Sequence, residues 1–125
     1  MREEVPFEVL DSSAVMRLAK LRNPAGRYLL IDLVALFARD VPTQIVACQD
    51  ALASGDFEAL RRAAHAAKGN AGVLGAIEFG AICARIECRA ASGVVSDLSA
   101  FVQTLPAAFH RAKAALDLID VREET

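Results

Sequence analysis

Apolar residues recur every three or four positions over most of this 125-residue chain, which is the spacing of amphipathic helices. The C-terminal stripe alternates steps of four and three, as in the seam of a helical bundle: Leu98, Val102, Leu105, Phe109, Ala112, Leu116 and Ile119. A longer stripe keeps one phase over the middle of the first half: Leu30, Val34, Phe37, Val41, Ile45, Cys48 and Leu52. Pro42 lies inside the longer stripe and predicts a bend, because the phase is unbroken on both sides, and Pro106 predicts a kink in the C-terminal helix.

Two shorter helices are predicted between these long ones. One runs from Asp56, an N-cap residue, to about Leu74, with Gly75 just past its end. Its apolar seam is narrow: Leu60, Ala64, Ala67, Ala71 and Leu74. The other spans about residues 76–91 and ends at Gly93, with four residues directed inward: Phe79, Ile82, Cys83 and Ile86. The last helix is expected to start near residues 96–97.

The N-terminal part predicts one more short helix. Residues 1–10 carry charge and a proline and are expected to form an extended arm. Asp11 and the two serines after it offer N-cap oxygens for a helix running to about Arg22, with an apolar stripe of Val15, Leu18 and Leu21. Asn23 and Pro24 are predicted to stop that helix and to begin the next, with Asn23 as its cap and Pro24 in its first turn.

These elements predict an all-α fold. Four long amphipathic helices joined by short loops form an antiparallel four-helix bundle, and the additional short N-terminal helix covers one end. The expected domain boundaries are residues 1–10 for the arm and residues 11–122 for the bundle. The sequence has no strand signal, no internal repeat and no low-complexity segment.

Composition narrows the possible functions. A net charge of −2 provides no basic excess for nucleic acid, and the longest unbroken apolar run, residues 33–38, is far too short for membrane insertion. No signal peptide is recognised at the N-terminus. Three cysteines without metal-ligand spacing argue against a disulfide framework or a zinc site and for a reducing compartment. We therefore expect a soluble cytoplasmic domain without a metal or cofactor of its own.

The helix predicted for residues 56–75 has an unusual outer face. With its apolar seam at zero, His65 lies roughly 140° round the helix, Gly69 roughly 180° and Gly72 roughly 120°, while Arg61 and Lys68 lie roughly 100° and 80° round. Each glycine costs about 1 kcal/mol relative to alanine in a helix interior. Exposed glycines beside a histidine leave room for another macromolecule to approach the imidazole. The arrangement suits a histidine that a docking partner phosphorylates.

The run His65-Ala66-Ala67-Lys68-Gly69-Asn70, followed by Gly72, Leu74 and Gly75, resembles the His-x-x-Lys-Gly-Ser/Asn signature of histidine-containing phosphotransfer (HPt) domains. The resemblance covers roughly residues 10–93. It includes residues 37–42 and 51–56 before the signature and a run after it made of Ala76, Phe79, Cys83, Ile86 and Glu87. Ala67 and Ile86 stand where the family usually has leucine, and both departures affect packing rather than chemistry.

The resemblance implies a phosphorelay intermediate. His65 would accept a phosphoryl group on Nε2 from an aspartyl phosphate of a response-regulator receiver domain, possibly one of a hybrid sensor histidine kinase, and pass it to another receiver aspartate. Lys68 would stabilise the phosphoryl group, and the receiver domain would supply Mg²⁺ and a lysine. The chain has no ATP site, so no kinase activity of its own is expected. The family expectation for its oligomeric state is a monomer.

Each remaining candidate has a functional and a structural interpretation. Gly69 and Gly72 favour partner docking, with close helix packing as the alternative. Arg61 and Arg62 are candidates for a basic docking rim, to which Arg85 and Arg89 could contribute, or belong to an ordinary solvated face. Asn70 is interpreted as polar filler or an interhelix hydrogen bond, and Glu87 as a partner for a neighbouring helix. The three cysteines Cys48, Cys83 and Cys88 are expected in the core, and His110 is expected to be an ordinary surface residue.

A second function remains open on these grounds. A non-catalytic helical adaptor would keep the same fold and bind a signalling partner through the same surface. The presence of both His65 and Lys68 argues against it. A bundle with a buried metal or haem is excluded because its inward-facing positions carry neither histidines nor carboxylates.

Overall fold

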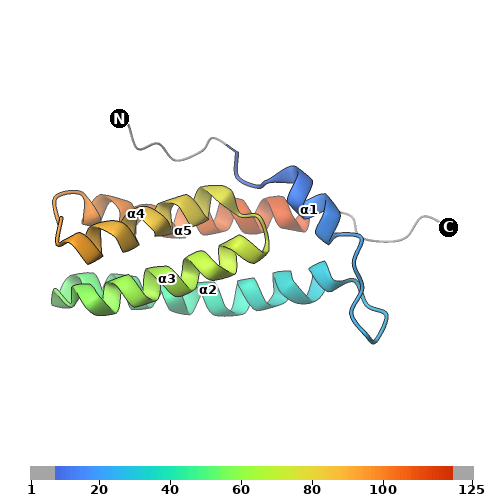
Figure 1. The fold of residues 1–125 in the computed structure, drawn as a ribbon, viewed down its shortest axis with the longest axis horizontal. Helices are drawn as coiled ribbons and strands as arrows, with labels where there is room; N and C mark the ends of the chain where they lie inside the picture. Colours follow the sequence, from blue (N-terminus) through green and yellow to red (C-terminus); the bar gives the residue numbers. More distant parts are fainter. Residues whose placement is uncertain (1–7, 120–125) are drawn as a thin grey trace.

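The computed structural model describes residues 8–119 as an antiparallel bundle of helices, and the predicted all-α class is confirmed (Figure 1). The helices are α1 (Ser12–Leu18), α2 (Leu29–Ser54), α3 (Phe57–Val73), α4 (Ile77–Ser92) and α5 (Leu98–Asp117). Residues 1–7 of the predicted arm and residues 120–122 of the predicted bundle lie outside the described residues. Within the described part, Val9 and Leu10 pack partly against the core.

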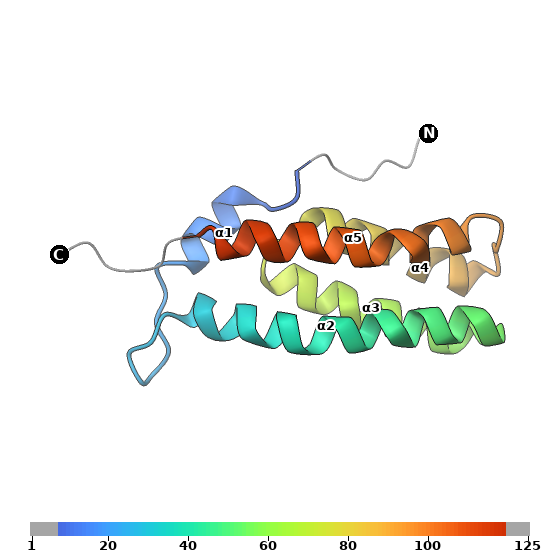
Figure 2. The same ribbon diagram turned by 180° about the vertical axis from the view of Figure 1, so that it is seen from behind.

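The four long helices pack in the cyclic order α2, α3, α4, α5. Figure 1 shows α3 and α4 on the near side, and Figure 2 shows α2 and α5 from behind. Three aromatic rings from different helices meet in the core: Phe37 lies 6.2 Å from Phe79 and 5.3 Å from Phe109 between ring centroids. The predicted seam of α5 is buried from Leu98 to Leu116 and partly buried at Ile119. None of the described helices is long and apolar enough to span a bilayer.

Both prolines are accommodated within continuous helices. Pro42 lies in the middle of α2 and Pro106 in α5, and each helix extends well beyond its proline on both sides. Both prolines also line a shallow groove on the outer surface of the bundle. A proline lacks the N–H that would bond four residues back, and on an outer surface water can satisfy the carbonyl that this leaves free. The continuity of the helix expected across Pro42 is confirmed, and the bend predicted there and the kink predicted at Pro106 stay predictions.

The connection between α1 and α2 differs from the prediction. Helix α1 ends at Leu18 rather than near Arg22, and Leu21, predicted to be apolar and inward, is 51% exposed. Asn23 does not cap a helix. Its side-chain oxygen instead accepts hydrogen bonds from the N–H groups of Ala25 and Arg27, both at 3.0 Å.

The chain in this connection forms a tight turn. An isolated antiparallel bridge joins Arg22 to Tyr28, and Gly26 takes a positive φ of 87° within the turn. The side-chain amide of Asn23 also donates to Asp32 of α2 at 2.7 Å. Because Asn23 folds the turn back on itself, Pro24 lies in the turn and α2 begins only at Leu29.

The ends of α3 are set by the residues that predicted them. The Asp56 side chain accepts a hydrogen bond from the N–H of Ala59 at 3.0 Å, and Gly75 has a φ of +66° just past the C-cap Leu74. The carbonyl of Gly75 accepts from the N–H of Asp11 at 2.7 Å, which holds the start of α1 against this turn. Both ends of α3 are therefore tied down, so the helix is a firm support for the side chains on its outer face.

Replacing Leu105 with alanine should lower the free energy of unfolding by roughly 2–5 kcal/mol, because the side chain is fully buried in the seam of α5. The matched control is Leu36→Ala on α2, where the leucine is 41% exposed and the loss should stay below about 1 kcal/mol. Urea denaturation followed by circular dichroism measures both. Equal losses for the two variants would contradict the assigned inner face of α5.

Candidate functional site

The outer face of α3 carries an exposed imidazole beside bare backbone. The His65 side chain is 65% exposed, and Gly69 and Gly72 lie on the same outer side of the helix. A Cβ built on either glycine would meet no atom within 4 Å, so neither glycine is needed for helix packing. The opposite face of α3 is fully buried at Leu60, Ala64, Ala67 and Ala71.

Glu87 on α4 brings His65 and Lys68 together. One of its carboxylate oxygens, Oε2, lies 2.8 Å from Nδ1 of His65, and the other, Oε1, lies 2.6 Å from Nζ of Lys68. The Glu87 side chain is 19% exposed, whereas the Lys68 side chain is 40% exposed. Glu87 therefore pairs with a neighbouring helix, as expected. The residues with which it pairs are the predicted site residues His65 and Lys68.

The environment of Glu87 favours its charged form. The pKa of its carboxyl group is lowered chiefly by the Lys68 ammonium and further by His65, against partial burial, which favours the protonated form. Because the pKa is lower in the folded protein, the ionised group stabilises the fold at neutral pH. That contribution is lost as the pH falls through the folded-state pKa, which lies below the ordinary value of 4.5.

The arginines of the predicted basic rim are engaged elsewhere. Arg61 donates from Nε to Glu58 at 3.0 Å, and Arg62 contacts the same carboxylate at 3.4 Å, so the single charge of Glu58 offsets part of their combined charge. Arg89, a possible contributor to that rim or part of a solvated face, is largely buried instead, which neither interpretation predicted. Its side chain is 16% exposed, pairs with Asp97 at 2.6 Å and lies over the Phe101 ring. Arg85 is only partly buried, on α4.

The remaining candidates have structural roles. Asn70 donates to Gln44 of α2 at 3.0 Å, which is the interhelix hydrogen bond offered as one of its interpretations. Cys48 and Cys83 are buried as predicted, and burial raises the pKa of the Cys48 thiol to about 11. The prediction is wrong for Cys88, which is exposed on α4. Residues 8–119 contain no group of three or more His, Cys, Asp or Glu side chains arranged to hold a metal ion.

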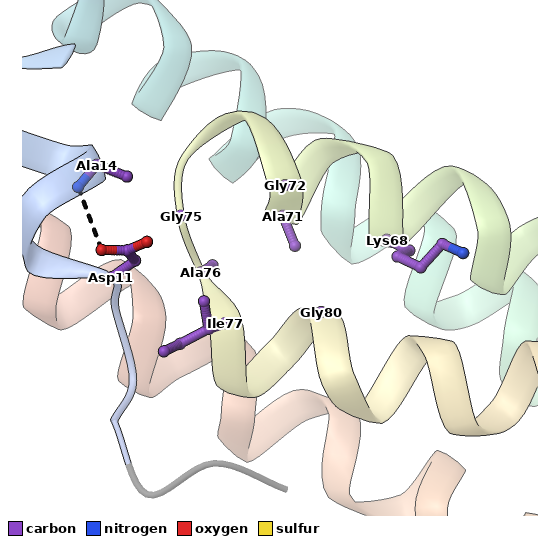
Figure 3. Close-up of a pocket in the computed structure, with 9 residues that line it drawn as sticks. All are labelled: Asp11, Ala14, Lys68, Ala71, Gly72, Gly75, Ala76, Ile77 and Gly80. Carbon is purple, nitrogen blue, oxygen red and sulfur yellow. Dashed lines mark hydrogen bonds between the residues drawn. The ribbon is translucent and has the colours of Figure 1, made fainter. Parts of the chain in front are cut away.

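A groove continues from the site along the α3–α4 boundary to the start of α1 (Figure 3). Its volume is about 320 Å³. Lys68 lines it at the end near His65, and Asp11 and Ala14 line it at the other end. Small residues line much of the rest, among them Gly72, Gly75 and Gly80. The side chain of Lys68 thus belongs both to the cluster around Glu87 and to this groove.

One protein family matches most of the chain. The family model of the Hpt domain matches residues 32–117, which include α3, α4, α5 and most of α2. The chain belongs to the Hpt family. As an Hpt domain, it has a histidine phosphotransfer role in phosphorelays. The matched range begins inside α2 and does not include α1 or the turn that follows it.

A solved structure shows the same fold as this Hpt domain. The crystal structure of histidine-containing phosphotransfer protein B (HptB) from Pseudomonas aeruginosa PAO1 matches with a TM-score of 0.75 and 22% sequence identity. The match covers 90% of this chain and 94% of the other. A search of curated proteins finds no match.

Sequence reasoning missed Glu87 as a member of the site in this Hpt domain. The residue was noted only as part of the resemblance and as a pairing candidate. A stronger signal lay in its spacing: Glu87 follows the buried Cys83 by one helical turn, so it flanks the inner stripe of α4. A carboxylate at such a border faces the neighbouring helix, and α3 presents His65 and Lys68 there.

The glycines of this Hpt domain should differ in what alanine does to stability. Gly69→Ala and Gly72→Ala should each raise the free energy of unfolding by roughly 0.5–1 kcal/mol, because both lie in a helix with open space around them. Gly75→Ala should lower it by roughly 1–2 kcal/mol, because φ is +66° and the new Cβ would lie 3.4 Å from Val15. Thermal and urea denaturation compare the three variants. A loss of stability at Gly69 would refute the open outer face.

Proposed function

We propose that His65 is the phosphorylated residue and that it carries a phosphoryl group between receiver-domain aspartates of two-component signalling proteins. The observation that carries the proposal is an exposed imidazole on a helix that is held at both ends, beside backbone without side chains. His110, the other histidine, is also exposed, but it neighbours Phe109 on α5, and no ionic partner is seen for it among the described residues.

The transfer needs a nucleophile and one neutralising charge from this chain. The lone pair of the His65 ring nitrogen Nε2 attacks phosphorus, the bond between phosphorus and the aspartyl oxygen breaks, and its electron pair returns to the aspartate carboxylate. The reverse step delivers the phosphoryl group to a second receiver aspartate. Such reactions depend on alignment and on neutralisation of charge. Mg²⁺ and a lysine of the receiver domain neutralise charge on one side, and Lys68 contributes an ammonium group on the other.

The outer face of α3 is also the surface on which a receiver domain would dock. Gly69 and Gly72 leave the space that the rim of a receiver active site needs in order to reach the imidazole. Arg61 and Arg62 lie one turn before His65 on α3 and can exchange Glu58 for acidic groups of the partner. We further propose that the protein acts as a monomer in the cytoplasm, where receiver domains are found.

His65→Gln should abolish phosphate uptake from a phosphorylated receiver domain, because glutamine has no nucleophilic ring nitrogen. The matched control is His110→Gln, which should take up phosphate like the wild type. The measurement is radiolabelled phosphate on the protein after mixing, with the lability to acid and stability to base that mark phosphohistidine. Circular dichroism checks that both variants remain helical.

Two outcomes would contradict the proposal. If the wild type gains no phosphate from any receiver domain of its host, the carrier function fails, and a partner-binding adaptor becomes the better explanation. If His65→Gln still gains acid-labile phosphate while His110→Gln does not, the assignment of the histidine is wrong.

Enlarging Gly69 should separate docking from chemistry. Gly69→Leu should slow transfer from a receiver domain by about 100-fold, because even a small displacement of the reacting groups is costly. Phosphorylation by the small donor phosphoramidate should change little, since that donor needs no docking surface. Ala107→Leu adds a side chain at an exposed position of α5 and is the control. Equal slowing with both donors would argue that leucine distorts the site itself.

A further inference from the structure

Two arginines on the outer face of α3 share one exposed carboxylate. Oε1 of Glu58 accepts a hydrogen bond from Nε of Arg61 at 3.0 Å, and Oε2 accepts from Nη2 of the same residue. Nη1 of Arg62 lies 3.4 Å from the same Oε2. The side chains of Glu58, Arg61 and Arg62 are 57%, 35% and 62% exposed. A single negative charge thus meets two positive ones on a surface that a partner can reach.

This charged group lies on the same side of α3 as the exposed imidazole. Glu58 precedes His65 by seven residues, so the two side chains differ by only roughly 20° round the helix. The pKa of the Arg61 guanidinium is raised chiefly by its hydrogen bond to Glu58 and, in smaller part, by the charge of Glu87. Because Glu87 contacts His65, Arg61 lies within electrostatic reach of the proposed site. A partner that approaches the imidazole therefore meets Glu58 and both arginines.

We infer that Glu58 is a specificity-determining residue that competes with receiver-domain carboxylates for Arg61 and Arg62 and so weakens the docking of the most acidic receiver surfaces. This role rests on the proposed function, since the competing carboxylates belong to a receiver domain. A carboxylate of the partner that binds either guanidinium group has to displace Glu58 from it. The displaced Glu58 then stays in the interface as a negative charge, and like charges brought together across an interface disfavour the complex.

The exposure of the group makes this competition adjustable rather than absolute. Ion pairs between exposed side chains contribute little net energy in water, so the arginines can leave Glu58 when a partner arrives. Charges at the rim of an interface act mainly on the association rate and on its dependence on salt. Glu58 also lies in the first turn of α3, where a negative charge stabilises the helix. That effect on stability does not depend on a partner, so the two roles can be separated by experiment.

The test compares Glu58→Gln with the wild type. The second-order rate of phosphate transfer is measured from phosphorylated receiver domains of the host that differ in net charge, at about 0.01 M and about 1 M salt, where charges are screened over roughly 30 Å and 3 Å. Phosphoramidate gives the rate without docking. Asp117→Asn is the matched control, because Asp117 is 53% exposed and pairs with Lys113 at 2.7 Å on α5, a helix that does not adjoin α3. Both substitutions remove one negative charge.

At low salt, Glu58→Gln should accelerate transfer from the most acidic receiver domain about threefold to tenfold, because both guanidinium groups are then open to its carboxylates. The least acidic receiver domain should respond little. At high salt, the variant and the wild type should transfer at the same rate. Asp117→Asn should match the wild type with every receiver domain, and phosphoramidate should phosphorylate all three proteins equally. Circular dichroism checks that Glu58→Gln remains helical.

A Glu58→Gln variant that is no faster than the wild type at low salt, or whose rate differs from it equally at both salt concentrations, would overturn the role of Glu58 while the proposed function stands. The role is also refuted if Asp117→Asn accelerates transfer as much, since net charge alone then explains the effect, or if phosphoramidate reacts faster with Glu58→Gln. A wild type that no receiver domain phosphorylates would instead overturn the proposed function.

Discussion

The close packing of α3 on α4 is the constraint on which the site depends. Alanines form much of the buried face of α3, and a Cβ added to Gly80 of α4 would lie only 3.5 Å from the Cβ of Ala71. Small side chains allow two helices to approach closely, because little volume separates their backbones. That approach lets the short side chain of Glu87 reach across to Nδ1 of His65. Larger residues in this seam would separate the helices and open the contact.

The inner face of α3 is therefore suited to helix packing, and its outer face is suited to access by a partner. On the inner face, small residues improve packing and stabilise the fold. On the outer face, Gly69 and Gly72 pack against nothing and cost helix stability. A stabilised surface would carry alanine at both positions, so their presence fits a surface shaped for a partner. Functional sites commonly have a lower folding stability than the same surface could have, because they must leave room for another molecule to bind.

Most of the fold followed from the sequence, because the relevant signals are local. The seam of α5 and the ends of α3 depend on periodicity and on single capping residues such as Asp56, and both are found as predicted. The turn around Asn23 was missed, because the same side chain can cap a helix or close a turn, and contacts with Asp32 favour the turn. The role of Glu87 in the site and the burial of Arg89 were not predicted, for a related reason. Periodicity can place a side chain at the border of the inner face of its helix, but the partners of both residues lie on other segments.

The charges around His65 suit transient rather than stable binding of a phosphoryl group. Among the described residues, Lys68 is the ammonium group that shares its carboxylate partner, Glu87, with His65. Arg61 and Arg62 are bound to Glu58, on an exposed surface where ion pairs contribute little net energy. A site with several unpaired arginines would bind a phosphoryl group tightly and release it slowly. Under the proposed function, modest neutralisation keeps the phosphorylated histidine reactive toward the next receiver domain.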